Sequence, residues 1–162
     1  MTTDKFVFFW GGTFSQWCTS PFEIGGFQYN CCEQYMMAQK ALFFDDFVIY
    51  NQIMETSHPA QQKALGRKVK GFDKEKWDSV CREIVYDANY AKFTQNPKMM
   101  AELMATGDRE IVEASPEDKI WGIGLHENDE RVHDKSKWQG TNWLGEAIMQ
   151  VREKLRTIKI EM

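Results

Sequence analysis

The most constraining feature of this sequence is a stripe of apolar residues with helical spacing in the middle of the chain. The intervals are four, three, four and three residues, at Trp77, Cys81, Ile84, Ala88 and Ala91. Such spacing places all five side chains on one face of an α-helix, and that apolar face is buried only if it packs against other elements. We therefore expect one helix of several turns here and a fold assembled largely by helix packing.

The remaining segments predict further helices and only two short strands. Residues 6–10 and 109–114 are β-prone runs. Helix signals are more numerous, with Pro at first helical positions, an Asp N-cap at residue 73 and a Gly stop at residue 107. The other helices are expected over 31–44, from 59 to 66 or 71, over 97–106 and over 143–156, and Asp73 is the expected N-cap of the helix that carries the stripe. The fold class expected is mainly α with a small β element, not a regular βαβ array.

A single compact domain spanning residues 1–162 is expected. This length is near the commonest domain size, and the sequence contains no internal repeat, low-complexity tract or Pro/Gly/Ser-rich linker. Hydrophobic residues make up 43% of the chain and aromatic residues 14%, which is enough to build a core. This composition excludes a disordered, collagen-like or coiled-coil protein.

Charge and cysteine content exclude several classes of function. The 20 Lys and Arg residues are outnumbered by 24 Asp and Glu residues, so a nucleic acid or an anionic lipid surface is not attracted globally, and any nucleic-acid contact needs a local patch. The cysteines form neither a CxxC pair nor a Cys/His cluster with zinc spacing, so neither a metal nor a disulfide framework is expected. We expect a reduced cytoplasmic protein without a membrane span.

Glu33 and Lys40 are the first candidates for chemistry. On a helix over 31–44 they are seven residues apart and return to within about 20° of one another, and Met37 and Phe44 share their face. Among large apolar side chains the pKa of a carboxyl group is raised and that of an amine is lowered, which suits proton transfer or covalent chemistry. The alternative is that both residues border a buried helix as a structural ion pair.

A second candidate region is the segment SPEDKIWGIGL, residues 115–125. Trp121 is suited to stack on a base, Gly122 and Gly124 allow a ligand close to the backbone, and Asp118 offers a carboxylate to a sugar or a water. The alternative is a tight turn that leads into a core strand with an ordinary buried Trp. The GxGxxG and GxxxxGK[ST] patterns are absent, which disfavours a Rossmann domain and a P-loop.

Two further segments offer groups for a phosphate or a sugar. Gly140, Thr141 and Asn142 precede the last predicted helix, whose free backbone N–H groups can bind an anion, although these residues are also ordinary helix caps. The segment KALGRKV carries a basic cluster that can meet a pyrophosphate, although such clusters are more often a solvated face. The cluster consists of Lys63, Arg67, Lys68 and Lys70.

Together and in this order, these segments resemble the NADAR family, also called YbiA-like. The resemblance runs nearly from end to end and rests on FVFFWGGTFSQW, CCEQYMMAQKALFF with its E-x6-K spacing, KALGRKV, the helix around Trp77, LMATGDREIVEASPEDKIWGIGL and WQGTNWLGEAIMQVREKL. The pieces IWGIGL and GTNWLG are specific in combination. One departure is Gln16, which stands in FSQW where many relatives have Asn.

The resemblance implies a compact, mostly helical YbiA-like domain and an enzyme, a hydrolase that acts on the N-glycosyl bond between a ribose and a nitrogenous group. Some relatives are associated with phosphoribosyl intermediates of riboflavin biosynthesis, and others with removal of ADP-ribose from guanine bases. The catalytic residues implied are Glu33, Lys40 and Asp118, and no cofactor is expected. The ligand-binding residues expected are Ser15, Arg67, Trp121, Gly122, Asn142 and Gly145.

The main expectation is removal of ADP-ribose from modified guanine in nucleic acid or nucleotides. The partners expected are an ADP-ribose-containing or phosphoribosyl small molecule and, as a further candidate, ADP-ribosylated DNA or RNA. The alternatives are an N-glycosidase acting on phosphoribosyl riboflavin-biosynthesis intermediates and, in another class, a non-catalytic ADP-ribose-binding module. Both an oxocarbenium route that uses Glu33 and an imine route through Lys40 fit the residues.

Overall fold

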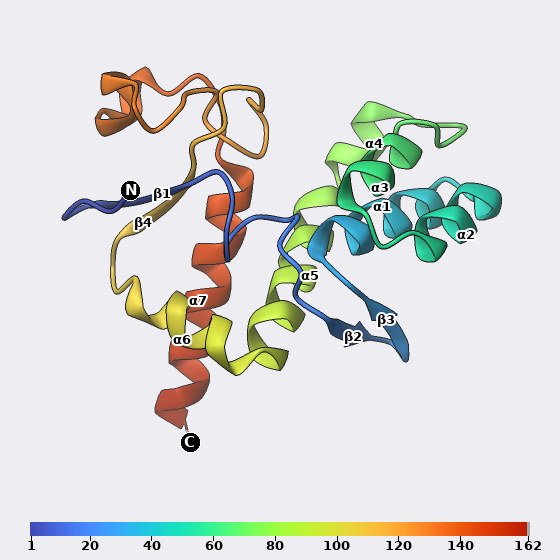
Figure 1. Ribbon diagram of the computed structural model, residues 1–162, viewed down its shortest axis with the longest axis horizontal. Coiled ribbons are helices and arrows are strands. Elements are labelled where there is room, and N and C mark those ends of the chain that lie inside the picture. The colour runs from blue at the N-terminus through green and yellow to red at the C-terminus, as the bar shows by residue number, and fades with distance from the viewer. Residues whose placement is uncertain (162) are drawn as a thin grey trace. The chain divides into compact units, whose positions relative to one another are not determined.

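The computed structural model describes residues 1–161 and is mainly helical, with seven α-helices, two 3-10 helices and four short strands in that range (Figure 1). The predicted fold class, mainly α with a small β element, is confirmed. Contacts divide the chain into two compact units: a central unit, Gln16–Asn96, and a terminal unit, Met1–Ser15 with Pro97–Met162. A single domain over residues 1–162 stays a prediction.

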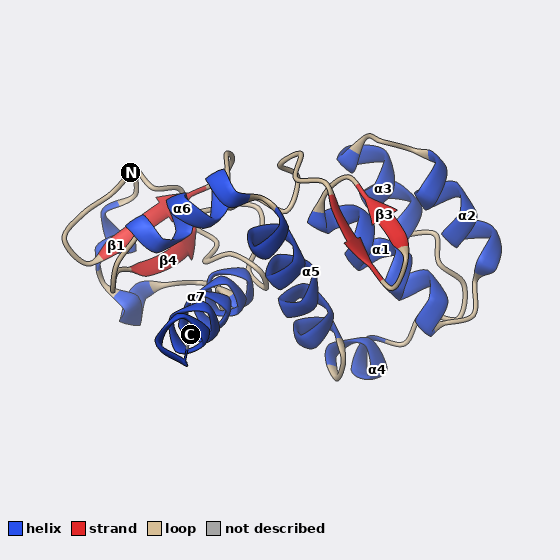
Figure 2. Ribbon diagram, turned by 90° about the horizontal axis from the view of Figure 1, so that it is seen from below, coloured by secondary structure: helices blue, strands red, loops and turns tan. Residues whose placement is uncertain are grey.

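The central unit consists of a β-hairpin and five helices. The hairpin pairs β2 (Phe22–Ile24) with β3 (Phe27–Tyr29) in antiparallel register, and Figure 2 shows its strands in red beside α1. The helices are α1 (Cys32–Phe43), α2 (Phe47–Glu55), α3 (Pro59–Gly66), α4 (Lys74–Asp78) and α5 (Cys81–Gln95). Because α1 packs against α2, α3 and α5, it is the central helix of this unit.

Capping residues explain where several of these helices begin. Asp73 accepts a hydrogen bond from the Lys76 amide at the start of α4, as predicted from the sequence. Pro59 occupies the first turn of α3, where its missing N–H group leaves no hydrogen bond unmade. Asp46 starts α2, a helix that the sequence analysis did not identify, by accepting from the Ile49 amide.

The apolar stripe from Trp77 to Ala91 lies on two helices instead of one. Trp77 belongs to α4, which ends at Asp78, and α5 begins only at Cys81. The Ser79 hydroxyl donates to the Lys76 carbonyl oxygen at 2.6 Å and closes the last turn of α4. Four of the five stripe residues are nevertheless buried and Ile84 is half-buried, so the stripe predicted burial mostly correctly and helix continuity wrongly.

The terminal unit contains a two-stranded parallel sheet covered by a long helix. β1 (Phe6–Phe9) pairs with β4 (Glu110–Glu113) in register Phe6 to Glu110, so both predicted strands are confirmed. α7 (Trp143–Glu161) packs on β4, and Figure 1 shows it in red beside both strands. α6 (Pro97–Ala105) ends before Gly107, whose φ of +63° is the left-handed conformation predicted for a helix stop.

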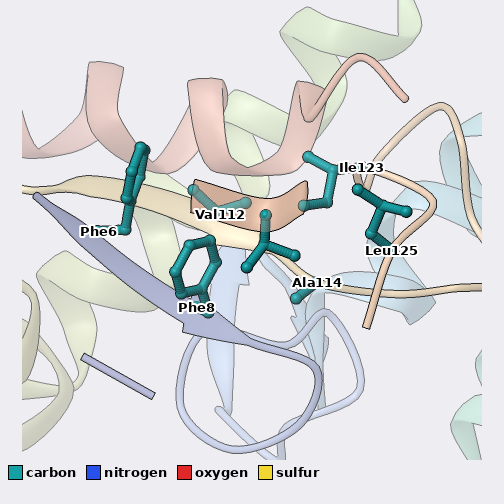
Figure 3. Packing of buried hydrophobic residues seen from close by; sticks show 7 residues of the cluster. Phe6, Phe8, Val112, Ala114, Ile123 and Leu125 are labelled. Atoms are coloured by element: carbon teal, nitrogen blue, oxygen red, sulfur yellow. The ribbon is translucent and has the colours of Figure 1, made fainter. Parts of the chain in front are cut away.

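The core of the terminal unit forms between the sheet and the chain that follows it. Figure 3 shows side chains of β1 and β4 together with apolar residues beyond β4. The buried cluster consists of Phe6, Phe8, Val112, Ala114, Ile123, Leu125 and Val132. Ile123 and Leu125 therefore anchor the WGIG segment in this core, and this fixes the position of the polar turn that precedes the segment.

None of the helices described over residues 1–161 is both long and apolar enough to cross a bilayer.

Candidate active site

Glu33 lies in the first turn of α1 and is buried, with 6% of its surface exposed. Its backbone amide donates to the Gln16 carbonyl oxygen at 3.0 Å, which ties the start of α1 to the preceding loop. A carboxylate at this position is stabilised by the positive end of the helix dipole. The structure therefore places a carboxyl group inside the central unit, where it is shielded from water.

Lys40 lies two turns after Glu33 on α1 and is half-buried. Burial lowers the pKa of its amine, the neighbouring Glu33 carboxylate opposes this effect, and Arg67 adds to it. Its Nζ atom lies 4.5 Å from the centroid of the Phe72 ring. A lysine with a lowered pKa carries more neutral amine near pH 7 than an ordinary lysine, and neutral amine is the nucleophilic form.

Arg67 is brought to this pair by the close packing of α3 on α1. A Cβ atom at Gly66 would collide with Sδ of Met37, so glycine lets α3 approach α1 without displacing the Met37 side chain. Met37 lies three residues before Lys40, and Arg67 directly follows Gly66. Glu33, Lys40 and Arg67, three of the predicted site residues, therefore lie together in the central unit.

Asp118 caps a turn in the terminal unit. Its Oδ1 atom accepts hydrogen bonds from the amides of Ile120 at 2.9 Å and Trp121 at 2.8 Å. This is an Asx-type turn, in which the side chain replaces a backbone acceptor. One carboxylate oxygen of Asp118 therefore holds the turn, and the catalytic role of the group stays a prediction.

Trp121 is half-buried and packs edge to face on Trp143, with the ring centroids 5.7 Å apart. Trp143 is the first residue of α7, so the turn and the helix start support each other. The half-exposed indole ring retains surface on which a base or sugar can stack. Trp121 is therefore placed both to pack on Trp143 and to offer its exposed ring surface to a ligand.

The expectation of free N–H groups before the last helix is corrected by the structure. The amides of Thr141 and Asn142 donate to the carbonyl oxygens of Lys119 and Gly122, at 3.0 and 3.1 Å. Those of the next two residues also bond to the 120–121 backbone. The start of α7 is therefore capped by the turn that contains Trp121, and these amides are not available to an anion.

Both polar atoms of the Asn142 side chain form hydrogen bonds within the terminal unit. Its Oδ1 atom accepts from the Glu113 amide at 3.0 Å, and its Nδ2 group donates to the Ile111 carbonyl oxygen at 3.0 Å. The residue is 1% exposed and has a φ of +52°. Asn142 thus joins α7 to β4, and its predicted contact with a ligand is untested.

Gly122 and Gly145 are close to protein atoms of the terminal unit. A Cβ atom at Gly122 would lie 2.8 Å from Oε2 of Glu113. A Cβ atom at Gly145 would overlap the Ile111 carbonyl oxygen. Tight packing of the chain therefore explains both glycines, and their predicted ligand contacts stay predictions.

The FSQW motif crosses from one unit to the other along the chain. Ser15, half-buried in the terminal unit, donates its amide to the Gly12 carbonyl oxygen at 3.0 Å. Gln16 is buried in the central unit, where its Oε1 atom accepts from the Asn89 side chain at 3.1 Å. Gln16 therefore supports the core beneath Glu33, and ligand binding by Ser15 stays a prediction.

The predicted residues thus form two groups, one in each unit. Phe72, which covers the Lys40 amine, was missed by the sequence analysis, although an aromatic residue after the Gly71 turn was a usable signal. A cavity of about 830 Å³ lies elsewhere in the terminal unit and contains none of the predicted site residues. Its lining combines acidic and basic side chains, among them Asp108, Arg109 and Lys135.

Comparison with known proteins identifies relatives over most of the chain. Residues 8–156 match the NADAR domain family. N-glycosidase R617 of Acanthamoeba polyphaga mimivirus is 44% identical over 94% of this chain and 98% of that protein. N-glycosidase YbiA of Escherichia coli is 31% identical over 89% of this chain and 81% of that protein. The NMR structure of Escherichia coli YbiA matches with a TM-score of 0.81 at 28% identity, over 100% of this chain and 91% of that one.

A further relative has a different name. The riboflavin biosynthesis protein VVA0006 of Vibrio vulnificus is 30% identical over 82% of this chain, which corresponds to 32% of that protein. The N-glycosidase relatives match over most of their own length. The class of protein is therefore an N-glycosidase, a hydrolase acting on N-glycosyl bonds, and the prediction of an enzyme is confirmed. The chain belongs to the NADAR family, as its motifs indicated.

Proposed function

We propose that this enzyme hydrolyses a ribosyl C–N bond and removes ADP-ribose from modified guanine, in nucleic acid or in nucleotides. The observation that carries the proposal is the group formed by buried Glu33, half-buried Lys40 and Arg67 in the central unit. It combines a carboxylate, an amine of lowered pKa and a cation suited to phosphate oxygens. These are the groups that the cleavage of a phosphorylated riboside requires.

Cleavage of a ribosyl C–N bond requires negative charge near the anomeric carbon. The bond breaks toward an oxocarbenium-like state, the leaving nitrogen takes up a proton, and water adds to the carbon. The Glu33 carboxylate serves either to stabilise this positive charge or to accept the proton of the attacking water. Burial strengthens both effects because less water screens the charge.

A second route becomes available when the leaving group is an exocyclic amine. The sugar ring opens to an iminium, the neutral amine of Lys40 adds to its carbon, and the base leaves with its nitrogen as a free amine. Water then hydrolyses the resulting imine, releases the sugar and restores Lys40. The lowered pKa of Lys40 favours this route over one in which Lys40 is only a charge.

Two features of the surface support ADP-ribose as the sugar. Arg67 lies beside Lys63, Lys68 and Lys70, all exposed, and such a cluster suits a pyrophosphate. Trp121 offers ring surface to a base.

The second candidate substrate is a phosphoribosyl intermediate of riboflavin synthesis, favoured by the name of the Vibrio vulnificus relative. A cytoplasmic location is proposed with either substrate.

The test is a side-by-side incubation with an ADP-ribosylated guanine oligonucleotide and with phosphoribosyl riboflavin intermediates, in which released sugar is followed by mass spectrometry. We expect ADP-ribose from the oligonucleotide and little release from the intermediates. Release from the intermediates alone would replace the proposed substrate with the second candidate. Tight binding of ADP-ribose without release from either substrate would contradict hydrolysis and favour a binding module.

A further inference from the structure

Three phenylalanine rings pack against one another at the end of α1 and stay open to water. Phe43 is the last residue of α1, and Phe44 follows it. The ring centroids of Phe43 and Phe44 lie 4.9 Å apart, and those of Phe44 and Phe72 lie 5.5 Å apart, both edge to face. Phe43 is nevertheless 42% exposed and Phe72 is 46% exposed. The rings are therefore held in place without being part of a core.

A fourth ring is brought to this place by Asp46, the N-cap of α2. The Asp46 carboxylate accepts from the amides of Ile49 at 3.1 Å and Lys70 at 2.9 Å. These two bonds join the start of α2 to the segment that leads into Phe72, two residues after Lys70. Phe47, the first residue of α2, is 58% exposed. Exposed apolar side chains gathered in this way are typical of a surface that binds a partner.

The charges of the neighbouring segment are mostly positive. Residues 63–76 contain six Lys and Arg side chains and two acidic ones, although the whole chain has a net charge of -4. All six basic side chains are exposed, and only Lys74 forms an ion pair with a described residue, at 2.5 Å from Asp78. Asp45 adds one exposed acid beside the rings. A local excess of positive charge remains, and an acidic protein needs such an excess to contact a polyanion.

Exposed rings beside cations are suited to single-stranded nucleic acid. Its unpaired bases stack on aromatic side chains, and its phosphates attract the lysines. In a duplex the bases already stack on one another, so their faces are closed to these rings. A lipid surface attracts the same cations, but it offers no ribosyl carbon to the Lys40 amine, whose Nζ atom lies 4.5 Å from the centroid of the Phe72 ring. In a strand every base is joined to such a carbon.

We propose that an aromatic–basic surface of the central unit binds single-stranded nucleic acid beside the modified nucleotide. This surface consists of Phe43, Phe44, Phe47, Phe72, Lys68 and Lys70. The ribosyl carbon under attack lies at Lys40, the neighbouring bases stack on the rings from Phe72 outward, and the two lysines contact the phosphates. The substrate is then a strand and not a free nucleotide. The reaction at Lys40 rests on the proposed function, whereas binding of an unmodified strand does not.

The charges of the surface are tested by fluorescence anisotropy with a labelled, unmodified single-stranded oligonucleotide that contains guanine. The native protein should bind it, more weakly as salt is added, and should bind the duplex of the same sequence more weakly. Lys68→Gln and Lys70→Gln should each reduce the slope of log K against log salt by about one, because each removes one phosphate contact. Lys98→Gln, at an exposed lysine of α6, is the matched control. No binding at low salt, or the same slope in all variants, would overturn the proposal.

The rings are tested with the same oligonucleotide. The double variant Phe43→Ala, Phe47→Ala should bind it about tenfold or more weakly, since stacking on both rings is lost. Phe47→Leu keeps an apolar side chain without a ring and should also weaken binding. Phe27→Ala, at a 57% exposed ring of β3, should bind as the native protein does. Native affinity in the folded double variant would contradict a stacking surface.

The link to the reaction is tested by comparing two substrates, an ADP-ribosylated guanine oligonucleotide and an ADP-ribosylated guanosine nucleotide. The double variant Phe43→Ala, Phe47→Ala should raise KM for the oligonucleotide and change kcat/KM for the nucleotide far less. Equal losses on both substrates would contradict strand binding by these rings. Inactivity of the native enzyme on both would overturn the proposed function and leave the anisotropy result standing.

Two other occupants of the surface are distinguished by parallel measurements. Cosedimentation with phosphatidylserine vesicles, without any binding of the oligonucleotide, would overturn the proposal and assign the surface to a lipid headgroup. A dimer in sedimentation velocity that is lost in the double variant Phe43→Ala, Phe47→Ala would overturn it in favour of a second copy of the chain. A monomer that binds the strand and ignores the vesicles is the result expected.

Discussion

The ammonium nitrogen of Lys40 lies 4.5 Å from the centroid of the Phe72 ring. The ring covers the amine while Glu33 on α1 and Arg67, the residue after α3, act on its charge. A nucleophilic lysine needs such partial shielding, which lowers its pKa without closing it off from a substrate. The two chemical routes assign different roles to Lys40, which is the nucleophile in the imine route and only a charge in the oxocarbenium route.

The first prediction concerns the imine route. Sodium borohydride added during turnover should reduce an imine between Lys40 and the opened sugar, which mass spectrometry detects as an added mass on the Lys40 peptide. Lys40→Arg should abolish turnover, because a guanidinium stays protonated and is a poor nucleophile. An active Lys40→Arg enzyme without any trapped adduct would contradict the route and leave Lys40 as a charge partner of Glu33.

Asp118 allows its turn-capping role to be separated from catalysis. Asp118→Asn keeps an oxygen that accepts from the Ile120 and Trp121 amides, so the melting temperature should stay close to native while the rate of C–N cleavage falls. Asp118→Ala removes that acceptor and should also lower the melting temperature. Full activity in Asp118→Asn would show that the carboxylate serves the turn alone.

Trp121 is predicted to bind the base or sugar of the ligand. Trp121→Ala should weaken ADP-ribose binding by ~1–3 kcal/mol, the usual contribution of stacking on an aromatic ring, as measured by calorimetry. Trp10→Ala, at a 48% exposed Trp of the same unit, is the control and should leave affinity unchanged. Native affinity together with lower stability in Trp121→Ala would assign the ring to packing on Trp143.

Gly145 is predicted to be required for packing of α7 on β4. Gly145→Ala would place its Cβ atom against the Ile111 carbonyl oxygen, and such overpacking typically costs about 1–3 kcal/mol of the free energy of unfolding. Gly11→Ala is the matched control, since a Cβ atom there meets nothing within 4 Å. Equal stability of the two variants in urea unfolding would contradict this account of Gly145.

The sequence predicted those elements whose signals are local. β1, β4, α1, α3, α6 and the start of α7 follow from β-prone runs, Pro at first helical positions and a Gly stop. The β2–β3 hairpin was missed, although Gly25 and Gly26 supply the positive φ angles of a tight hairpin turn. That pair between FEI and FQY, two triplets in which apolar and polar residues alternate, was a usable signal.

Other features depend on tertiary contacts that periodicity does not contain. α2 begins with Phe47 and Val48, residue types that favour strands, and it is helical because Asp46 caps it and it packs on α1. The break between α4 and α5, by contrast, coincides with a local hydrogen bond of Ser79, which periodicity does not contain either. Burial of the stripe was predicted because both helices bury the same side.

The candidate site was predicted residue by residue but not as an arrangement. Helical spacing placed Glu33 and Lys40 on one face, and the structure adds Arg67 because Gly66 allows α3 close to α1. Spacing did not reveal that the Asn142 side chain is hydrogen-bonded to the backbone of β4, or that Lys92 is buried. Both features depend on residues far away in the sequence. The missing information in each case is which polar group a side chain meets across the fold.

The most direct test of the whole account is the rate at which Glu33→Gln releases ADP-ribose from an ADP-ribosylated guanine oligonucleotide. The change removes the charge and conserves the shape, so the folded variant should be slower by ~10²–10³-fold, the usual loss when one well-placed electrostatic group is removed. Glu83→Gln, at an exposed position of α5, should keep the native rate. A folded Glu33→Gln enzyme with a near-native rate would contradict the account.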